Sequence, residues 1–460
     1  MSSTMTGSLA LHTDRYQLTM LAAYAKAGLA ERRAVFEVFV RRLPPARRYL
    51  VACGIGRVAR ALTQLRFGSD DLAWLEADPF LGPAFAHPAV RQMFEGFRFR
   101  AKVHAIPEGR VCFPCEPLVR VEGTLAETQL VETLLLSVIN HDTRIASKCA
   151  RIAQAARGRE CFEFGSRRTH EAAAVDAARA AYVAGFSGTS NEEAARRYGI
   201  PVTGTMAHAF VLAHAADHGE EGEAAAFRHF SETFPGPSTC LVDTFDTLRG
   251  VERAIEGAAR SLGGIRIDSG DLATLAIKPR NGLDLSARPG ARIVLSNDLD
   301  EYTIDAMMRA YVPVDAFGVG TMAVSPPDHP SLGGVYKLVA MEDEKGRMVA
   351  VQKRAPGKGS SAAPKQVFRA TDGPLRDVVA IESERLPGEP LLVPIVDGGK
   401  VVADVSAKAA RDRLVTDLAR LEPSLRSIEP RAASDGYPTT ISPQLEALYH
   451  RVEAEGRVVL

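Results

Sequence analysis

Residues 263–276, GGIRIDSGDLATLA, decide the fold class, because a strand passes into a helix within them. The isoleucines at both ends of 265–267 are typical of a short buried strand, and the apolar residues after position 271 have helical spacing. Between the two, Arg266, Asp268 and Asp271 place three charges around one glycine. Charge where a strand meets a helix is typical of α/β proteins that build a site at the strand ends.

The same alternation of strand and helix runs through the middle of the chain. Short apolar segments are separated by stretches with helical spacing, which is the pattern that builds parallel sheets covered on both faces. The seven segments are CFEFG at 161–165, AGFSG at 184–188, IPVTGTMAH at 200–208, TCLVDTFD at 239–246, GIRIDSGD at 264–271, ARIVLSNDLDE at 291–301 and DAFGVGT at 315–321.

Nearly every segment ends in residues that carry chemistry. In a closed βα barrel all C-terminal strand ends meet at one rim, whereas an open doubly wound sheet brings them together only around a switch point. Seven such ends favour the barrel. The residues are Arg167, Thr189, Ser190, Thr205, His208, Asp243, Asp246, Arg266, Asp268, Asp271, Asn297, Asp298, Gly318, Gly320 and Thr321.

Both flanks of this region have their own α/β pattern. Residues 33–44 and 48–55 indicate paired strands, and 118–140 a strand that leads into a long helix. After the barrel, 333–342 indicates a strand and 407–421 a helix. We therefore expect the flanks to pack together as a second α/β domain. The expected domain limits are 1–135 for the N-terminal segment, 136–335 for the barrel and 336–460 for the C-terminal segment.

Composition excludes several classes of function. The chain has 460 residues, 56 Lys+Arg and 56 Asp+Glu, so its formal net charge is zero. A neutral chain offers no bulk electrostatic attraction for nucleic acid or an anionic membrane. No apolar run is long enough to span a bilayer, and the N-terminal residues lack a signal-peptide pattern. We expect a cytoplasmic enzyme.

Six cysteines in a chain of this length do not form a disulfide scaffold. Cys112 and Cys115 make a single C-x-x-C without a second pair, so we expect reduced thiols rather than a redox or zinc site. His214 and His218 have the i, i+4 spacing of metal ligands, but they lack the glutamate of a zinc protease helix.

Several site candidates have a structural alternative. The glycines of FGVGT, Gly318 and Gly320, are typical of a phosphate cradle completed by Thr321, or of a plain tight turn. Their place at a charged rim favours the cradle. His208 at its strand end is either catalytic or structural.

The two aspartate pairs, 243/246 and 268/271, either cap helices or bind ligand. As ligand-binding groups they suit a ribose diol, a Mg²⁺-bound diphosphate or a developing cation, because hard oxygen ligands suit Mg²⁺. Tyr16, in TDRYQLTM, either packs in the core or stacks on a planar ligand.

Taken together, these strings resemble the nicotinate phosphoribosyltransferase family. The match runs along most of the chain in family order. The strings are TDRYQLTM, FEFGSRRTH, GFSGTSN, GTMAHAF, LVDTFDTLRG, GIRIDSGDL, LSNDLDE, FGVGT, GGVYKLV, KQVFR and YPTTIS.

The resemblance implies an irregular, TIM-like βα barrel with a second α/β domain built from both chain ends. It implies an enzyme that joins nicotinate to phosphoribosyl diphosphate, giving nicotinate mononucleotide and diphosphate in NAD biosynthesis, coupled to ATP hydrolysis and with Mg²⁺. It further implies a homodimer with the active site at the subunit interface.

The resemblance also assigns roles to individual residues. His208 corresponds to a transiently phosphorylated histidine, and Asp243 and Asp268 serve the ribose and Mg²⁺. The remaining assignments concern substrate binding: Tyr16 from a neighbouring subunit, Phe164, Arg167, Ser190, Thr205 and Arg266 for nicotinate, and Asn297, Gly318, Gly320 and Thr321 for the phosphoribosyl group.

Ser190 bears on the choice of substrate. Related nicotinamide-using enzymes carry an acidic residue at this position, which repels a carboxylate, so Ser190 favours nicotinate. The alternatives are a nicotinamide- or quinolinate-using relative, a sugar-phosphate aldolase or isomerase barrel, and a ligand-binding relative without turnover. The conformations of loops 41–49 and 354–365 do not follow from the sequence.

Overall fold

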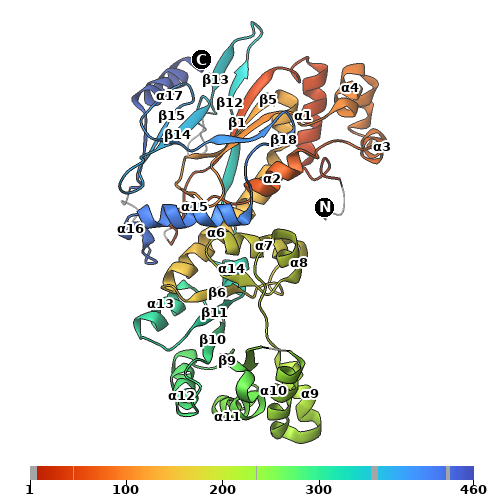
Figure 1. The fold of residues 1–460 in the computed structure, drawn as a ribbon. Coiled ribbons are helices and arrows are strands. Elements are labelled where there is room, and N and C mark those ends of the chain that lie inside the picture. The colour runs from red at the N-terminus through yellow and green to blue at the C-terminus, as the bar shows by residue number, and fades with distance from the viewer. Residues whose placement is uncertain (1–7, 45, 235, 354–360, 431–435) are drawn as a thin grey trace. The chain divides into compact units, whose positions relative to one another are not determined.

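The chain divides into two compact units, which we call unit 1 and unit 2. Unit 1 combines residues 1–144 and 331–460, and unit 2 contains residues 145–330 (Figure 1). The computed structural model describes residues 8–44, 46–234, 236–353, 361–430 and 436–460. Parts of the two loops named above, residue 45 and residues 354–360, lie outside the described residues.

Unit 2 is built on one parallel sheet. Its strand order is β7-β6-β11-β10-β9-β8, and every neighbouring pair is parallel. Figure 1 shows β6, β11, β10 and β9 side by side in this order. The strands are β6 (Glu160–Glu163), β7 (Gly188–Thr189), β8 (Ser238–Leu241), β9 (Leu262–Ile267), β10 (Arg292–Asn297) and β11 (Ala316–Val319).

The last strand of unit 2, β11, pairs with its first strand, β6. Strands that are far apart in the sequence are therefore neighbours in the sheet. A single parallel bridge between Thr189 and Val202 extends the sheet beyond β7. Among the described residues no pairing joins this edge to β8. The sheet is therefore a parallel half-barrel.

Helices follow the strands, as the sequence predicts. Ile265 and Ile267 of β9 are completely buried, because both faces of the sheet are covered. The helices of unit 2 are α7 (Glu171–Val183), α8 (Glu192–Tyr198), α9 (His208–His218), α10 (Gly222–Thr233), α11 (Thr247–Ala258), α12 (Leu272–Leu285), α13 (Glu301–Arg309) and α14 (Thr321–Val324), with the 3₁₀ turns η2 (Gly219–Glu221) and η3 (Ala259–Ser261).

The expected strand at 200–208 is wrong. Only Val202 makes a bridge, and His208 is the first residue of helix α9 rather than the end of a strand. This stretch contains Pro201 and Gly204, and both residue types are unfavourable for the regular hydrogen bonding of a β-strand.

Unit 1 contains an antiparallel eight-stranded sheet and smaller sheets. The eight strands have the order β18-β17-β3-β5-β1-β12-β13-β20. They are β18 (Lys400–Val401), β17 (Val393–Asp397), β3 (Lys102–Ala105), β5 (Pro117–Thr124), β1 (Arg33–Val40), β12 (Gly334–Glu342), β13 (Met348–Val351) and β20 (Arg457–Val459).

A second sheet of unit 1 has the order β16-β14-β15-β19, and β2 pairs with β4. The expected pairing of residues 48–55 with 33–44 is therefore wrong: β1 lies between β5 and β12. The strands are β16 (Glu389–Pro390), β14 (Lys365–Arg369), β15 (Asp377–Ile381), β19 (Thr439–Ile441), β2 (Leu50–Val51) and β4 (Val111–Cys112).

The helices of unit 1 cover a large apolar core that draws on both chain ends, as Leu21, Phe94 and Val396 show. They are α1 (Arg15–Lys26), α2 (Ile55–Leu62), α3 (Ser69–Ala77), α4 (Pro88–Gly96), α5 (Leu125–Leu130), α15 (Ala407–Arg420), α16 (Pro423–Arg426) and α17 (Pro443–Glu455), with the 3₁₀ turn η1 (Gly82–Ala86). None of the helices in the described part of the chain has the length and apolarity that a membrane crossing needs.

One long helix, α6 (Glu132–Ala155), runs across the limit between the units at residue 144. The sequence pattern placed this limit at 135, which also lies within α6, because a change of packing partner within a helix leaves no mark in a sequence. At the other limit β12 already belongs to unit 1, so unit 2 ends at 330 rather than 335.

Candidate functional site

The ends of β8 and β9 and the start of α9 meet around the carboxylate of Asp243. This side chain is 1% exposed, and its Oδ1 lies 3.0 Å from Nε2 of His208. Its Oδ2 accepts the backbone N–H of Asp268 at 2.8 Å and the hydroxyl of Ser269 at 2.6 Å. A carboxylate only accepts hydrogen bonds, so Nε2 of His208 carries a proton, and the neutral form of the ring has its lone pair on Nδ1.

Arg266 organises the neighbouring strand ends. Its Nε donates to the hydroxyl of Ser296 at 2.7 Å, and its Nη2 donates to Oδ1 of Asp268 at 2.9 Å. Ser296 donates in turn to the same Asp268 oxygen at 2.5 Å. The guanidinium carbon lies 5.4 Å from the ring centroid of Phe164, within the range of a cation–π contact. The predicted site residues at the ends of β6, β8 and β9 thus form one connected group, which Ser296 of β10 joins.

The ring of Phe164 explains why residue 318 is a glycine. A Cβ on Gly318 would lie 2.5 Å from the Phe164 ring, so any side chain there would displace the ring. Gly320 has more room, with the carbonyl oxygen of Phe164 3.3 Å from its Cβ position. Thr321 follows as the first residue of α14. Gly318 therefore leaves room for the Phe164 ring. The backbone at Gly320, next to Thr321, lies close to the loop that carries Phe164.

Asn297 ends β10 with a φ of +136°, a conformation that asparagine rarely adopts. Strained backbone of this kind concentrates at functional sites. The carbonyl of Asn297 accepts the N–H of Leu299 at 2.7 Å, which turns the chain sharply after the strand. The exposed side chain of Asn297 stands at the same sheet edge as Ser296.

A second polar cluster joins the ends of β6 and β7. The buried carboxyl of Glu163 accepts the hydroxyl of Thr189 at 2.6 Å and the N–H of Gly165. Its backbone carbonyl accepts the N–H of Ser190 at 3.0 Å. Asn191 Nδ2 donates to Ser166 at 2.9 Å, which adds a second link between the two loops. Burial raises the pKa of Glu163, and the two donors oppose that rise.

Three of the predicted nicotinate-binding residues lie at or near these strand ends and make few hydrogen bonds with the rest of the described residues. Arg167 and Ser190 are exposed. The guanidinium of Arg167 forms no ion pair with any residue in the described part of the chain. Thr205 is half-buried and donates weakly to the carbonyl of Met206 at 3.4 Å.

The second members of both aspartate pairs are helix caps. Asp246 accepts the N–H of Arg249 at 2.9 Å at the start of α11. Asp271 accepts the N–H and hydroxyl of Thr274 at the start of α12. These hydrogen bonds lower the pKa of Asp271. Only the first member of each pair, Asp243 or Asp268, belongs to the connected group.

Tyr16 lies in α1 of unit 1 and is 49% exposed, so it is not a core residue. Its hydroxyl lies 3.4 Å from a carboxylate oxygen of Glu132. Burial and the nearby charges of Glu132 and Asp14 raise its pKa.

The carboxylates of the site suit a metal ion that arrives with a ligand. Among the described residues no three His, Cys, Asp or Glu side chains form a ligand set. Asp243 already accepts three hydrogen bonds, whereas Oδ2 of Asp268 accepts none from the described residues. Mg²⁺ is commonly bound by one or two carboxylates and substrate phosphates. Asp268 therefore fits Mg²⁺ held mainly by a diphosphate, and it has more free acceptor capacity than Asp243.

The other metal and thiol candidates of the sequence do not form sites together. His214 contacts His229 rather than His218. All six cysteines are free, and Cys112 is buried while Cys115 is exposed. Burial raises the pKa of both thiols of the C-x-x-C.

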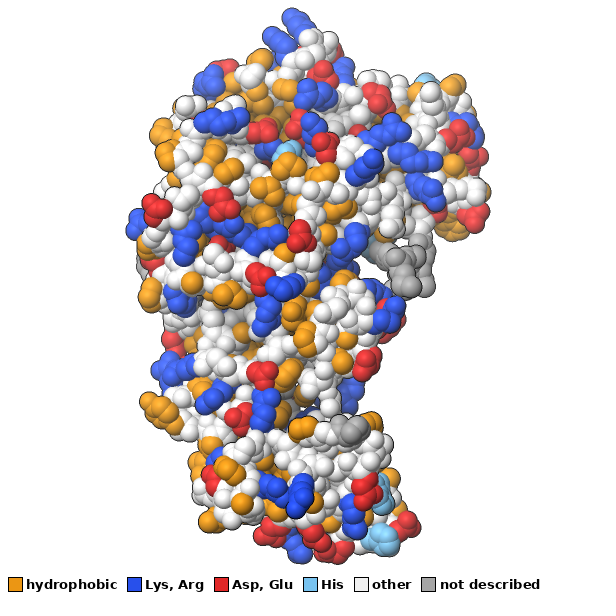
Figure 2. Space-filling model, in the orientation of Figure 1, with side chains coloured by type: hydrophobic (Ala, Val, Ile, Leu, Met, Phe, Trp, Pro, Cys, Tyr) orange, Lys and Arg blue, Asp and Glu red, His pale blue; other side chains and the backbone are white. Residues whose placement is uncertain are grey.

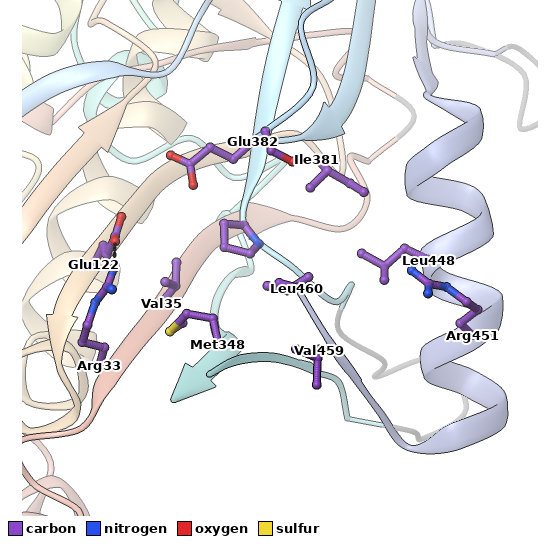
Figure 3. Close-up of a pocket in the computed structure, with 12 residues that line it drawn as sticks. Arg33, Val35, Glu122, Met348, Ile381, Glu382, Leu448, Arg451, Val459 and Leu460 are labelled. Carbon is purple, nitrogen blue, oxygen red and sulfur yellow. Dashed lines mark hydrogen bonds and ion pairs between the residues drawn. The ribbon is translucent and has the colours of Figure 1, made fainter. Parts of the chain in front are cut away.

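A pocket of about 370 Å³ lies in unit 1, beside the C-terminal residue Leu460 (Figure 3). Three of its charged side chains, Arg33, Glu122 and Glu382, are in ion pairs. Figure 3 shows the ion pair of Arg33 with Glu122, 2.8 Å long, and Glu382 pairs with Arg120. None of the predicted site residues lines this pocket.

Sequence reasoning missed three residues that hold the site together: Glu163, Ser269 and Ser296. Glu163 had a visible signal, since it is an acidic residue within the buried segment CFEFG. Ser296 and Ser269 sit beside predicted residues in LSND and DSGD, but a single serine there has no distinguishing pattern.

Two family models match most of the chain. The model of the N-terminal domain of nicotinate phosphoribosyltransferase (NAPRTase) matches residues 11–140, and the NAPRTase family model matches residues 159–372. A nicotinate phosphoribosyltransferase of Mycobacterium tuberculosis, pncB1, is 46% identical over 420 residues, covering 89% of this chain and 91% of the relative. The chain belongs to the nicotinate phosphoribosyltransferase family.

Further relatives extend the likeness beyond one group of organisms. The nicotinate phosphoribosyltransferase of Bacillus subtilis is 41% identical over 372 residues, covering 79% of this chain and 73% of that protein. The crystal structure of human nicotinic acid phosphoribosyltransferase superposes with a TM-score of 0.80 at 27% identity, covering 96% of this chain and 99% of the human one. This α/β fold is thus the fold of a nicotinate phosphoribosyltransferase.

Proposed function

We propose that this chain joins nicotinate to phosphoribosyl diphosphate, forming nicotinate mononucleotide and diphosphate in NAD biosynthesis. The observation that carries the proposal is the connected group of His208, Asp243, Arg266, Asp268 and Phe164 at one edge of the half-barrel. It combines an aromatic surface, a cation and two carboxylates, which suit a pyridine ring and a ribosyl donor.

The reaction needs positioning more than proton transfer. The pyridine nitrogen attacks C1′ as diphosphate leaves, and positive charge develops on the ribose. Carboxylates near the ribose stabilise that charge, and fixed groups bring the two reactants into line. Mg²⁺, when bound with the diphosphate, neutralises charge on the leaving group. Asp268 is the residue that would hold it, through its free Oδ2.

For the pyridine, we assign Phe164 to one face of the ring. Its own ring is fixed by Gly318 and Arg266, so it presents a rigid surface. We assign the opposite face to Tyr16 from a second copy of the chain, which makes the enzyme a homodimer with shared sites. Its exposure leaves Tyr16 available for that contact.

The number of arginine side chains that remain for a substrate carboxylate supports nicotinate over quinolinate. Arg266 already binds Ser296 and Asp268, so of the two predicted arginines Arg167 is the one that remains for a substrate carboxylate. Nicotinate has one carboxylate and quinolinate has two. Ser190 adds no negative charge at the end of β7, which supports nicotinate over nicotinamide. Thr205 is assigned to the same substrate.

We assign the phosphoribosyl group to the β10 and β11 ends. The turned backbone at Asn297 and the exposed backbone around Gly320 and Thr321 suit its phosphate. Gly318 is assigned to the same phosphate, and its lack of a side chain also leaves room for the Phe164 ring.

ATP coupling is assigned to His208. With its proton held on Nε2 by Asp243, the lone pair of Nδ1 is free to attack the γ-phosphorus of ATP, forming an N–P bond as ADP leaves. The phosphoryl group adds negative charge at the start of α9, and can order nearby loops around the donor. We further propose that unit 2 is a TIM-like catalytic barrel, that unit 1 is the second domain, and that the enzyme works in the cytoplasm.

A substrate panel tests the proposed function. Nicotinate, nicotinamide and quinolinate are each incubated with phosphoribosyl diphosphate and Mg²⁺, with and without ATP, and released diphosphate is measured. We expect release with nicotinate and stimulation by ATP. Release only with another pyridine, or nicotinate binding without diphosphate release, contradicts the proposal.

A further inference from the structure

Two histidines outside the proposed catalytic group face each other across the helical hairpin of α9 and α10. Nε2 of His214 lies 3.0 Å from Nδ1 of His229, and the two ring centroids are 5.1 Å apart. The pair is accessible: His214 is half-buried and His229 is exposed. Figure 2 shows histidine side chains, in pale blue, at the surface over the region of α9 in Figure 1.

The hydrogen bonds of His214 define where its lone pair points. Its Nδ1 lies 2.9 Å from the carbonyl oxygen of Phe210, one turn earlier in α9. A carbonyl only accepts, so Nδ1 carries the proton and Nε2 presents a lone pair toward His229. A histidine that donates its other nitrogen to a backbone carbonyl has the orientation found in metal-binding histidines. Phe210 also contacts the His214 ring edge-on, with centroids 4.8 Å apart, and this restrains its rotation.

The separation of the two nitrogens is close to that of a metal-bound pair. Zn–N bonds of 2.0–2.1 Å at a tetrahedral angle place two ligand nitrogens about 3.3 Å apart. The observed 3.0 Å needs only a small rotation of the exposed His229 ring. The Nδ1 proton of His229 moves to its exposed Nε2, so the pair binds metal without leaving the neutral state.

We propose that His214 and His229 together bind a divalent transition-metal ion that joins α9 to α10. In the described part of the chain no third His, Cys, Asp or Glu completes the set, so water fills the remaining positions. Imidazole nitrogens suit Zn²⁺, Ni²⁺ and Cu²⁺, whereas Mg²⁺ prefers oxygen ligands. The site is therefore distinct in chemistry from any Mg²⁺ that accompanies the substrate.

The matched control is His218. Its i, i+4 spacing to His214 makes it the partner that the sequence suggests, whereas the structure assigns His229. The test is calorimetric titration of the full chain, without an affinity tag, with NiCl₂ and ZnCl₂ in excess Mg²⁺. Wild type should bind one ion per chain, and His214→Ala and His229→Ala should each weaken binding at least tenfold. His218→Ala should change it less than twofold.

Thermal unfolding supplies a second readout that does not depend on enzyme activity. Ni²⁺ should raise the unfolding midpoint of wild type and of His218→Ala, because a ligand that bridges two helices stabilises the folded state. It should leave the midpoint of His229→Ala unchanged. Binding that persists in His229→Ala, binding lost in His218→Ala, or no binding by wild type overturns the proposal. None of these outcomes affects the assignment of His208.

Discussion

The two polar clusters of unit 2 stand at one sheet edge and are built in opposite ways. Around Asp243, carboxylates meet a histidine and, through Asp268, an arginine, and His208 stays 39% exposed. Around Glu163, a buried carboxyl accepts hydrogen bonds from a hydroxyl and an amide, and no cation of the described residues is hydrogen-bonded to it. In the first cluster His208 remains accessible, and in the second the hydrogen bonds join two loops. Under the proposed function, similar residue types at neighbouring strand ends serve chemistry in one case and positioning in the other.

The largest effect should come from removing the reactive atom of the first cluster. His208→Ala should lower nicotinate-dependent ATP hydrolysis by about 10³-fold, because no other side chain replaces the nucleophile. Some ATP-independent synthesis should remain, since the ring and ribose contacts are intact. ATP hydrolysis and nicotinate mononucleotide formation are measured side by side, with His218→Ala as the control on the same helix. Full ATP hydrolysis by His208→Ala would remove the assigned role.

Asp243→Asn tests whether orientation of His208 matters. The Asn oxygen still accepts from Asp268 and Ser269, so its amide faces His208 and forces that proton onto Nδ1. We expect a loss of ATP coupling that approaches that of His208→Ala, because a catalytic histidine held in the wrong tautomer loses most of its function. The control is Asp246→Asn, which keeps a good helix cap and should keep activity. Equal losses in both variants would contradict a distinction between the two aspartates.

Ser190→Asp places a charge where the second cluster meets the proposed substrate. An aspartate there repels a carboxylate, so kcat/KM for nicotinate should fall by about 10- to 100-fold, the range of a 1.4 to 2.8 kcal/mol effect. Ser190→Ala is the matched control, and should change kcat/KM much less. An unchanged kcat/KM in Ser190→Asp would refute this account of selectivity.

Glu163→Gln should separate positioning from folding. The amide cannot accept from both Gly165 and Thr189, so the loops loosen and KM for nicotinate should rise about threefold to tenfold with a smaller change in kcat. A purely structural role would lower the amount of active enzyme and leave KM unchanged.

The same variant makes a prediction about pH. Burial raises the pKa of Glu163 above the ordinary glutamate value of 4.5, so the unfolded chain ionises at lower pH than the folded one. Wild type therefore loses stability as pH rises from that value to the folded pKa. Glu163→Gln lacks this group, so its unfolding midpoint relative to wild type should improve as pH rises above about 4.5. A constant difference from pH 4 to 8 would contradict this.

The smallest effect should come from the helix cap at Asp271. Asp271→Ala should cost about 1 kcal/mol of stability and leave kcat within twofold, because among the described residues its side chain is hydrogen-bonded only to its own helix. Urea unfolding and steady-state kinetics check both parts. A large loss of kcat would show that Asp271 acts in the site and is not only a helix cap.

Local patterns predicted the parallel α/β character of unit 2, and they singled out most residues of its candidate site. The strand-to-helix steps and helix caps depend on residues close in sequence, such as Asp271 and Thr274. The sequence could not divide each aspartate pair into one site residue and one cap, because the partners of Asp243 come from residues 208, 268 and 269. Nor could it show that His214 faces His229, since that contact depends on how two helices pack.

In unit 1, strand β1 has one neighbour near it in the chain and one very far away: β5 begins at Pro117, and β12 at Gly334. During synthesis, the edge of β1 that pairs with β12 stays unpaired until all of unit 2 has been made. An unpaired strand edge can associate with other chains. Unit 2 is contiguous and can collapse during that wait, bringing residue 334 back toward its partner. Rapid folding of unit 2 should therefore shorten the time during which the N-terminal segment of unit 1 can aggregate.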